Sequence, residues 1–263
     1  MENAMYSALF GALSNEHRMN SIANNLANVN TTGYKRDLLA FKDTMVFFAH
    51  DYIMEPVASI RDKKFFPDPQ HLSRTRIATS LTDFQQAGLK VTSAPFDLAI
   101  SGEGFFKVAS PDGEFYTRNG HFTLNQEGTL VTEQGWPVMS EGGPITLPAG
   151  YKTATIAEDG RVFADGVETG QILLVSVDNL AGLEKQGNNL FRIRPGSETE
   201  EIAVDPARSW MAQGFLESAN VDAVYEMVNM IETQRQFEAY QKVMQTSDAI
   251  DREATTKVGR GRG

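Results

Sequence analysis

Cysteine is absent from this chain of 263 residues. The absence excludes a disulfide framework, a thiolate nucleophile and a thiolate metal site, and it makes folding indifferent to the redox state of the compartment. Long apolar runs are also missing, because the longest strongly apolar stretch, residues 172–177, is far shorter than the roughly 20 residues that span a bilayer. The N-terminus has neither a basic region nor a long apolar region, so the sequence predicts no cleaved secretory signal and no membrane insertion.

Basic residues are scarce relative to acidic ones: 24 Lys and Arg stand against 34 Asp and Glu, a formal net charge of −10. This balance argues against nucleic acid as a partner, because non-specific binding is driven by Lys and Arg side chains that release counterions from phosphates. Counting Gly and leaving out Tyr brings the hydrophobic fraction of 41% to about 46%, which is typical of a chain that buries a core. At about 150 residues per domain, one or two domains are expected.

Motifs for catalysis, metals and cofactors are missing as well. The four histidines show no metal-ligand spacing, and no nucleophile elbow or Walker phosphate loop occurs. Asp159 and Asp165 could in principle do acid and base work on glycans, but each precedes a glycine in a turn pair. We therefore interpret both as solvated loop carboxylates, and the sequence predicts no enzyme, no metal site and no cofactor.

The N-terminal segment, residues 2–29, contains one glycine and no proline, and its apolar side chains recur at spacings of three and four. This periodicity predicts an amphipathic helix with a narrow apolar stripe. Residues 30–33 end the helix, because Asn and Gly tolerate the left-handed backbone conformation found at helix ends. The stripe comprises Met5, Leu9, Ala12, Met19, Ile22, Leu26 and Val29.

The C-terminal segment, residues 215–258, has neither glycine nor proline. It predicts a second helix of about 30 residues and roughly 45 Å, longer than a compact domain needs. Asn220 is expected to cap this helix, with Asp222 in its first turn. One apolar stripe contains Val224, Val228 and Ile231, and it resumes in a displaced position with Phe237, Tyr240 and Met244.

The middle of the chain, residues 89–194, changes to an alternating period and contains turn pairs that supply the positive dihedrals of tight hairpins. These pairs are Asp112-Gly113, Asn119-Gly120, Asp159-Gly160 and Asp165-Gly166. Short strand-like runs lie at 97–100, 104–108, 115–117, 128–131 and 172–177. The pattern predicts an antiparallel β domain.

The expected fold class is α+β, an antiparallel β domain with long N- and C-terminal helices. We divide the chain into residues 1–36 with the first helix, 37–88 as an irregular connection with some strand content, 89–214 as the β domain, and 215–263 as the second helix and a basic tail. The prolines at 56, 67 and 69 are the reason for reading the connection as irregular.

A stripe two residues wide per heptad suits another helix better than a sheet. Burial of such side chains contributes about 1.5–3 kcal/mol each, whereas ordering the backbone costs about 1–2 kcal/mol per residue. Neither helix is expected to hold its shape alone. Either both helices complete the core of their own β domain, or they become ordered in a polymer with other copies.

Residues 21–36, Ser-Ile-Ala-Asn-Asn-Leu-Ala-Asn-Val-Asn-Thr-Thr-Gly-Tyr-Lys-Arg, form a motif that we call the signature segment. It closely resembles the N-terminal signature of the bacterial flagellar axial proteins, the rod and hook subunits. Residues 224–240 look like the C-terminal counterpart of that family, and residues 96–106 and 116–120 are similar to its β domain. Among these subunits the chain most resembles the proximal rod type.

The resemblance implies a structural subunit of the flagellar basal-body rod, exported by the flagellar type III apparatus into the periplasm. Its partners would be other copies and other rod proteins, with the terminal helices paired as a coiled-coil layer and the β domain outside. Close-packed side chains resist shear, so such a layer can transmit torque. The expected assembly interface comprises Leu9, Met19, Ile22, Asn24, Asn25, Leu26, Asn28, Val29, Val224, Val228, Ile231, Phe237 and Met244.

Two features of the signature segment carry separate expectations. The amides of Asn24, Asn25 and Asn28 either lie on a solvated face or hydrogen-bond between subunits and determine their register. Gly33 is expected at a turn that requires a positive φ.

Other functions remain open at this point. A distal rod or hook-type axial subunit would share the same motifs. A secreted β-domain hydrolase acting on cell-wall glycan would need an inward-facing pair of carboxylates. A binding module or adhesin of a different fibre would fold as a ligand-competent monomer.

Overall fold

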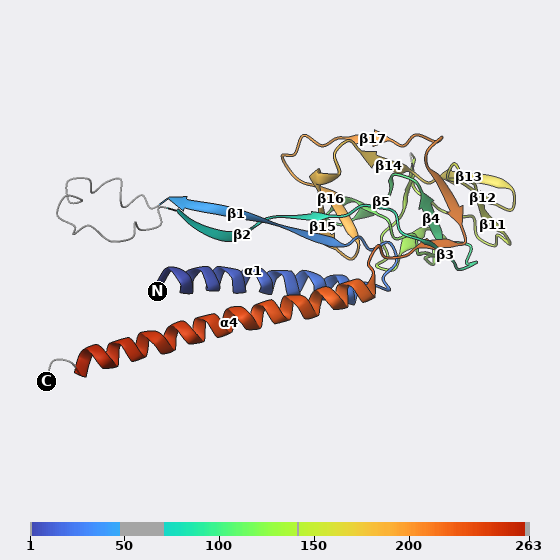
Figure 1. Ribbon diagram of the computed structural model, residues 1–263. Helices are drawn as coiled ribbons and strands as arrows, with labels where there is room; N and C mark the ends of the chain where they lie inside the picture. Colours follow the sequence, from blue (N-terminus) through green and yellow to red (C-terminus); the bar gives the residue numbers. More distant parts are fainter. Residues whose placement is uncertain (1, 48–70, 141, 261–263) are drawn as a thin grey trace. The chain divides into compact units, whose positions relative to one another are not determined.

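The chain forms two compact units in the computed structural model, which describes residues 2–47, 71–140 and 142–260 (Figure 1). The helical unit comprises residues 1–24, 37–81 and 224–263, and the β unit comprises residues 25–36 and 82–223. Among the described residues, no helix combines the length and the apolar character needed to cross a bilayer.

The helical unit contains two long helices that run in opposite directions, α1 (Glu2–Ala27) and α4 (Ala223–Arg260) (Figure 1). Gly11 of α1 lies against the ring of Tyr240 of α4, so closely that a Cβ on Gly11 would lie 2.5 Å from Tyr240 Cζ. Ala8, Ala12 and Asn15 are buried on the same side of α1 as Gly11. Because these residues are small, α1 brings its backbone close to the aromatic ring of α4.

Two long strands of the helical unit, β1 (Asp37–Phe47) and β2 (His71–Thr82), pair as a two-stranded sheet. Residues 37–88 are expected from the sequence to form an irregular connection with some strand content, and within the described part these two strands are longer and more regular than that expectation. All three prolines that suggested irregularity fall within residues 48–70, outside the described part of the chain, and neither strand contains proline or glycine. Pairing between strands so far apart in the sequence leaves no local signal.

The β unit is built on an antiparallel six-stranded sheet with the order β15-β16-β6-β5-β14-β17. Its strands are β5 (Phe105–Ser110), β6 (Gly113–Thr117), β14 (Leu174–Val177), β15 (Leu183–Gly187), β16 (Leu190–Ile193) and β17 (Glu201–Ala203). A short 3-10 helix, η1 (Leu180–Gly182), precedes β15. The predicted antiparallel β domain and the α+β class are confirmed.

Smaller antiparallel sheets complete the β unit. They pair β3 (Leu89–Val91) with β19 (Phe215–Glu217), β4 (Leu98–Ser101) with β18 (Trp210–Gln213), β7 (Phe122–Leu124) with β8 (Leu130–Thr132) and β9 (Met139–Ser140) with β10 (Gly143–Pro144). A further sheet contains β11 (Ala154–Ile156), β12 (Arg161–Ala164) and β13 (Val167–Gln171).

Three of the four predicted turn pairs make hairpins or lead directly into a strand. Asp165 and Gly166 join β12 to β13 with φ values of 49° and 83°, and two successive positive φ values define the favoured two-residue hairpin turn. Asp112-Gly113 joins β5 to β6, and Asp159-Gly160 precedes β12.

The prediction of a hairpin at Asn119-Gly120 is wrong. This pair connects β6 to β7, which belong to different sheets. A Cβ at Gly120 would lie 1.6 Å from the carbonyl oxygen of Leu98. Glycine is therefore present because two backbone segments approach closely, a contact that local sequence does not reveal.

Two hydrophobic clusters fill the β unit. The larger cluster includes Leu98, Phe106, Leu130 and Ile145. In the smaller cluster the rings of Phe84, Phe105 and Phe191 meet at centroid distances of 5.1–5.9 Å. Phe84 belongs to the segment that follows β2, so this aromatic group holds that segment against the main sheet.

The C-terminal segment differs from its prediction in two ways. Residues 215–217 form β19, and α4 begins at Ala223, so Asn220 lies before the helix and does not cap it. The side chain of Asn220 binds other backbone groups, described below. The helix runs for 38 residues to Arg260, longer than predicted, and includes part of the expected basic tail. Residues 261–263 lie outside the described part of the chain.

Candidate functional site

Helix α4 carries apolar side chains on two opposite faces. Val224, Val228 and Ile231 are exposed, with 71%, 49% and 52% of their surface accessible. Phe237 and Met244 are half-buried and share the side of Tyr240, which packs on α1. From residue 228 to residue 237 is nine positions, which at about 100° per residue is half a turn. The displaced stripe in the sequence therefore corresponds to two faces, one inward and one outward.

Helix α1 also divides its apolar residues between two faces. Ile22 is buried and lies on the same side as Gly11, whereas Leu9 is 41% exposed. Met19, Leu26 and the nearby Val29 are partly buried. Exposed side chains close to Leu9 along the helix are Met5, Tyr6 and Leu13. The structure thus does not gather the predicted assembly residues on one surface.

The asparagines of the signature segment have different surroundings. Asn25 is buried, and its Oδ1 accepts a hydrogen bond of 3.0 Å from the Tyr34 hydroxyl. Asn28 Oδ1 accepts a hydrogen bond from the Thr31 hydroxyl at 3.2 Å, and Asn24 is exposed. Asn25 therefore has a role within the chain, where it holds the turn that follows α1.

Gly33 lies at that turn with φ of 67°, as predicted. Its N–H donates to the Glu217 carbonyl at 2.8 Å. A Cβ at this position would lie 2.4 Å from Asn119 N and 2.5 Å from Arg118 C. Glycine is needed here for its positive φ and for the close approach of the backbone of residues 118–119.

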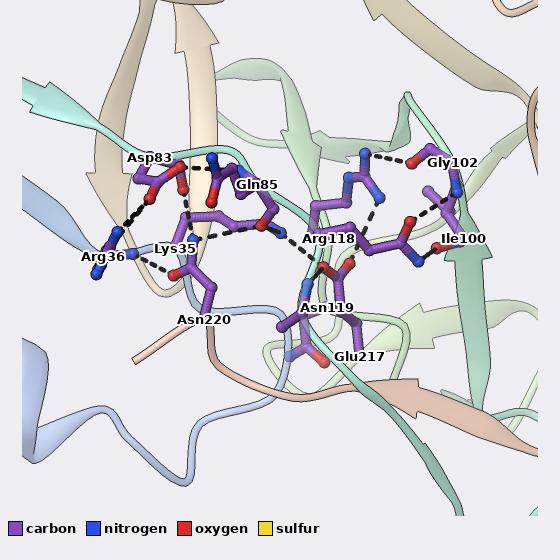
Figure 2. Close-up of polar contacts among 12 residues, drawn as sticks. Lys35, Arg36, Asp83, Gln85, Ile100, Gly102, Arg118, Asn119, Glu217 and Asn220 are labelled. Carbon is purple, nitrogen blue, oxygen red and sulfur yellow. Dashed lines mark hydrogen bonds and ion pairs between the residues drawn. The ribbon is translucent and has the colours of Figure 1, made fainter. Parts of the chain in front are cut away.

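Lys35, two residues further on, enters a buried ion-pair cluster. Its Nζ donates to Glu217 Oε1 at 2.6 Å and to the Gln85 carbonyl at 2.8 Å (Figure 2). Arg118 NH1 approaches Glu217 Oε2 at 3.4 Å, and its NH2 donates to the Gly102 carbonyl at 2.9 Å. Lys35, Arg118 and Glu217 are 0%, 5% and 1% exposed. Two buried cations thus share one carboxylate.

Burial dominates the electrostatics of these two cations. Desolvation lowers the pKa of Lys35 below its ordinary value of 10.5, and the adjacent Glu217 carboxylate opposes the shift. Desolvation likewise lowers the pKa of Arg118, again opposed by Glu217. Buried charges persist only where partners replace water, so the Glu217 carboxylate stabilises the cationic form of both.

Arg36 continues the network with partners of its own. Its side chain forms an ion pair with Asp83 Oδ2, with both Nε and NH2 at 2.9 Å (Figure 2). Its backbone N–H donates to Asn220 Oδ1 at 2.7 Å, and Asn220 Nδ2 donates to the Asp83 carbonyl at 2.7 Å. We call Lys35, Arg36, Asp83, Arg118, Glu217 and Asn220 the polar cluster.

The β15–β16 hairpin also holds the signature segment. Lys185 Nζ donates to the Lys35 carbonyl at 2.5 Å and lies 4.4 Å from the centre of the Tyr34 ring. Asn189, at the tip of the hairpin with φ of 58°, donates its side-chain N–H to the Thr32 carbonyl at 3.0 Å. Residues 32–35 are therefore held by side chains of the β15–β16 hairpin.

The sequence does not reveal the role of the polar cluster. Lys35 and Arg36 belong to the signature segment, and two adjacent cations that begin two residues after a turn glycine are the signal that could have pointed to a charged anchor. Their partners are distant in the chain: Glu217 is 182 positions from Lys35. No local pattern connects such residues.

The two carboxylates considered for glycan chemistry have structural partners. Asp159 binds the Arg161 backbone and guanidinium, and these contacts lower its pKa. Asp165 accepts hydrogen bonds from the backbone N–H groups of Lys152 and Thr153, which lower its pKa. Both are therefore exposed loop carboxylates, as the sequence predicts, and the structure adds that each stabilises its turn.

Comparison with protein families finds three models along the chain. Residues 5–35 match "Flagella basal body rod protein", residues 99–164 match "Flagellar hook protein FlgE/F/G D1 domain", and residues 212–256 match "Flagellar basal body rod FlgEFG protein C-terminal". The first match includes Gly33, Tyr34 and Lys35 of the signature segment.

Curated relatives are similar over nearly the whole chain. The chain is 36% identical over 262 residues to the flagellar basal-body rod protein FlgF of Caulobacter vibrioides, covering 99% of each chain. It is 36% identical to the rod protein FlgG of Borreliella burgdorferi, covering 94% of this chain and 96% of the relative. It is 34% identical to FlgG of Bacillus subtilis, covering 95% and 97%.

Proposed function

This chain belongs to the flagellar basal-body rod proteins, and on that premise we propose that it assembles into the rod by packing α1 and α4 against the helices of neighbouring subunits. It is a structural subunit of the rod, and the family places it in the flagellar basal body with other rod components. The finer parts of the proposal are a proximal position in the rod, a periplasmic location and export by the flagellar type III apparatus.

The observation that carries the assembly proposal is the outward stripe of α4, formed by Val224, Val228 and Ile231. The neighbouring Tyr225 and Met227, which lie on either flank of this stripe, are exposed as well. Such patches mark interaction sites, because water contact with apolar surface is unfavourable. Helices from adjacent subunits would cover the stripe and form a coiled-coil layer.

The remaining predicted residues take two roles in this proposal. Leu9, Met19, Asn24, Leu26, Asn28 and Val29 contribute to contacts around α1. Ile22, Phe237 and Met244 face inward and keep α1 and α4 together within one subunit. A packed helical layer of this kind barely deforms under shear, which suits a shaft that transmits torque.

We propose a mechanical role without catalysis. Asp159 and Asp165, the carboxylates weighed for a hydrolase, are each engaged by neighbouring backbone groups in hairpin turns. These contacts within the turns explain why carboxylates stand at both positions.

The test replaces the outward stripe with charge while leaving the inward face unchanged. A V228K/I231K variant places two cations where neighbouring helices would pack. The matched control is Q234K/Q241K, which adds the same charge at exposed positions on the flank of the same helix. Each is expressed in the source bacterium in place of its own copy, and basal bodies are isolated and analysed by mass spectrometry.

We expect Q234K/Q241K in basal bodies at the level of the unaltered chain, and V228K/I231K to be absent from them and to abolish motility. Both variants should melt at the same temperature as purified monomers, since the altered side chains are exposed. Incorporation of V228K/I231K at the control level would refute the stripe as an interface.

A further inference from the structure

The chain passes between the helical unit and the β unit four times, between residues 24 and 25, 36 and 37, 81 and 82, and 223 and 224. On the β-unit side, each crossing lies within a few residues of a buried or bonded polar group. Asn25 and Arg36 stand directly at the first two crossings, and Asp83 and Asn220 stand near the other two.

These four groups are connected to one another. Arg36 binds Asp83 through its guanidinium and Asn220 through its backbone N–H, and Asn220 binds the Asp83 carbonyl. Asn25 joins through the hydroxyl of Tyr34, which directly precedes Lys35. The network therefore reaches the chain next to all four crossings within the β unit, and Figure 2 shows the bonds that join Arg36, Asp83 and Asn220.

We propose that the polar cluster is a mechanical junction, which ties residues 25–36 to both ends of residues 82–223, so that a force delivered through any of the four crossings is shared by all of them. Bonds that act in parallel share a load, whereas segments held separately are pulled out one after another. Lys35, Arg118 and Glu217 are the positioning residues at its buried centre. The inference rests on the proposed function, since a rod subunit must pass torque through its own chain.

The charges at the buried centre predict which substitution there is the most damaging. Among the residues that the structure describes, Glu217 is the carboxylate bonded to both Lys35 and Arg118. Glu217→Gln therefore leaves two buried cations without that anion, whereas Lys35→Met or Arg118→Met leaves a one-to-one ion pair. Removing one partner of a buried pair is far more damaging than removing surplus charge. Asp83 and Glu103 also act on these cations, and Asp83 is already paired with Arg36.

Hydrogen exchange on the full-length chain separates this role from general stability. The reporter amides are Gly33 N–H, which donates to Glu217 O, and Arg36 N–H, which donates to Asn220 Oδ1. The reference amide is Leu130 N–H, bonded to Ile145 O in the larger hydrophobic cluster. The matched control is Glu114→Gln, which breaks a 2.7 Å ion pair with Lys107 in which the Glu114 side chain is 56% exposed.

We expect E217Q to accelerate exchange at the reporter amides by about tenfold or more relative to the reference amide, because the signature segment opens locally. K35M and R118M should give smaller accelerations, and E114Q none. The proposed junction would be refuted if E217Q accelerated exchange equally at the reporter and reference amides. It would also be refuted if E217Q accelerated exchange at the reporter amides no more than E114Q does. If E217Q fails to fold, the K35M and R118M ratios decide in the same way.

The second measurement is motor rotation under high torque. Cells carrying E217Q should contain the protein in their basal bodies and swim in dilute medium, but the fraction of rotating motors should fall several-fold in viscous medium, where torque is high. Unchanged rotation under load would overturn the mechanical role even if exchange is accelerated. Failure of the proposed function is distinguishable, since it would appear as normal incorporation of V228K/I231K.

Discussion

Gly33→Ala tests how tightly the signature segment is held. At this position φ is 67°, and a Cβ would lie 2.4 Å from Asn119 N. The matched control is Gly196→Ala, where φ is 82° and no heavy atom lies within 4 Å of the added Cβ. Both substitutions place alanine in the left-handed region, but only Gly33→Ala forces backbone atoms apart.

The expected magnitudes follow from this difference. The left-handed conformation costs alanine about 1–2 kcal/mol at either position, partly offset by about 0.4–1 kcal/mol from the less flexible unfolded chain. At Gly33, displacement of residues 118–119 adds about 1–3 kcal/mol, and a weakened bond to the Glu217 carbonyl adds about 1 kcal/mol. Gly33→Ala should therefore lower the free energy of unfolding by about 2–4 kcal/mol more than Gly196→Ala.

Urea denaturation followed by tryptophan fluorescence measures the effect. The chain has two tryptophans, Trp136 and Trp210, and both belong to the β unit, so the signal reports unfolding of that unit. With an m-value of about 2 kcal/mol/M, the two variants should differ in midpoint by about 1–2 M urea. Equal midpoints with equal m-values would show that the backbone contact at Gly33 contributes nothing.

Three further predictions concern other contacts. Asn220→Ala should lower the stability of the β unit by about 2 kcal/mol in the same assay, because Arg36 N–H and the Asp83 carbonyl lose their partner; a loss too small to measure would contradict this. The pKa of Asp165 is lowered from 3.8, so its stabilising contribution is present above about pH 4 and is lost as pH falls through the lowered pKa. The difference in melting temperature between the unaltered chain and Asp165→Asn should therefore shrink in acid, and a constant difference would refute the assignment. Gly11→Leu should lower the melting temperature of the helical unit, measured by circular dichroism, because the new side chain collides with Tyr240; adding Tyr240→Ala should restore part of the loss, and no restoration would exclude this contact as the cause.

The two helices and several turns could be predicted from the sequence because their signals are local. Apolar spacings of three and four predict α1 and α4, and Asp-Gly pairs at 112, 159 and 165 predict the positive φ values of their turns. Reliance on local signals also explains why the predictions at Asn220 and Asn119-Gly120 were wrong. Asn220 has the side chain of a helix cap, but a residue 184 positions away uses it, and Asn119-Gly120 serves a close backbone contact instead of a hairpin.

The sequence by itself determined the fold class, the presence of a long helix near each end of the chain, and the turn at Gly33. Helix periodicity and the conformational freedom of glycine act over a few residues, so they can be read locally. Tertiary structure alone decided which apolar side chains of α4 face inward, because burial depends on where a neighbouring helix lies. It also decided that Lys35 meets Glu217 in a buried cluster with Arg118. Desolvation makes such charges costly unless partners surround them, and those partners come together only when distant segments fold against each other.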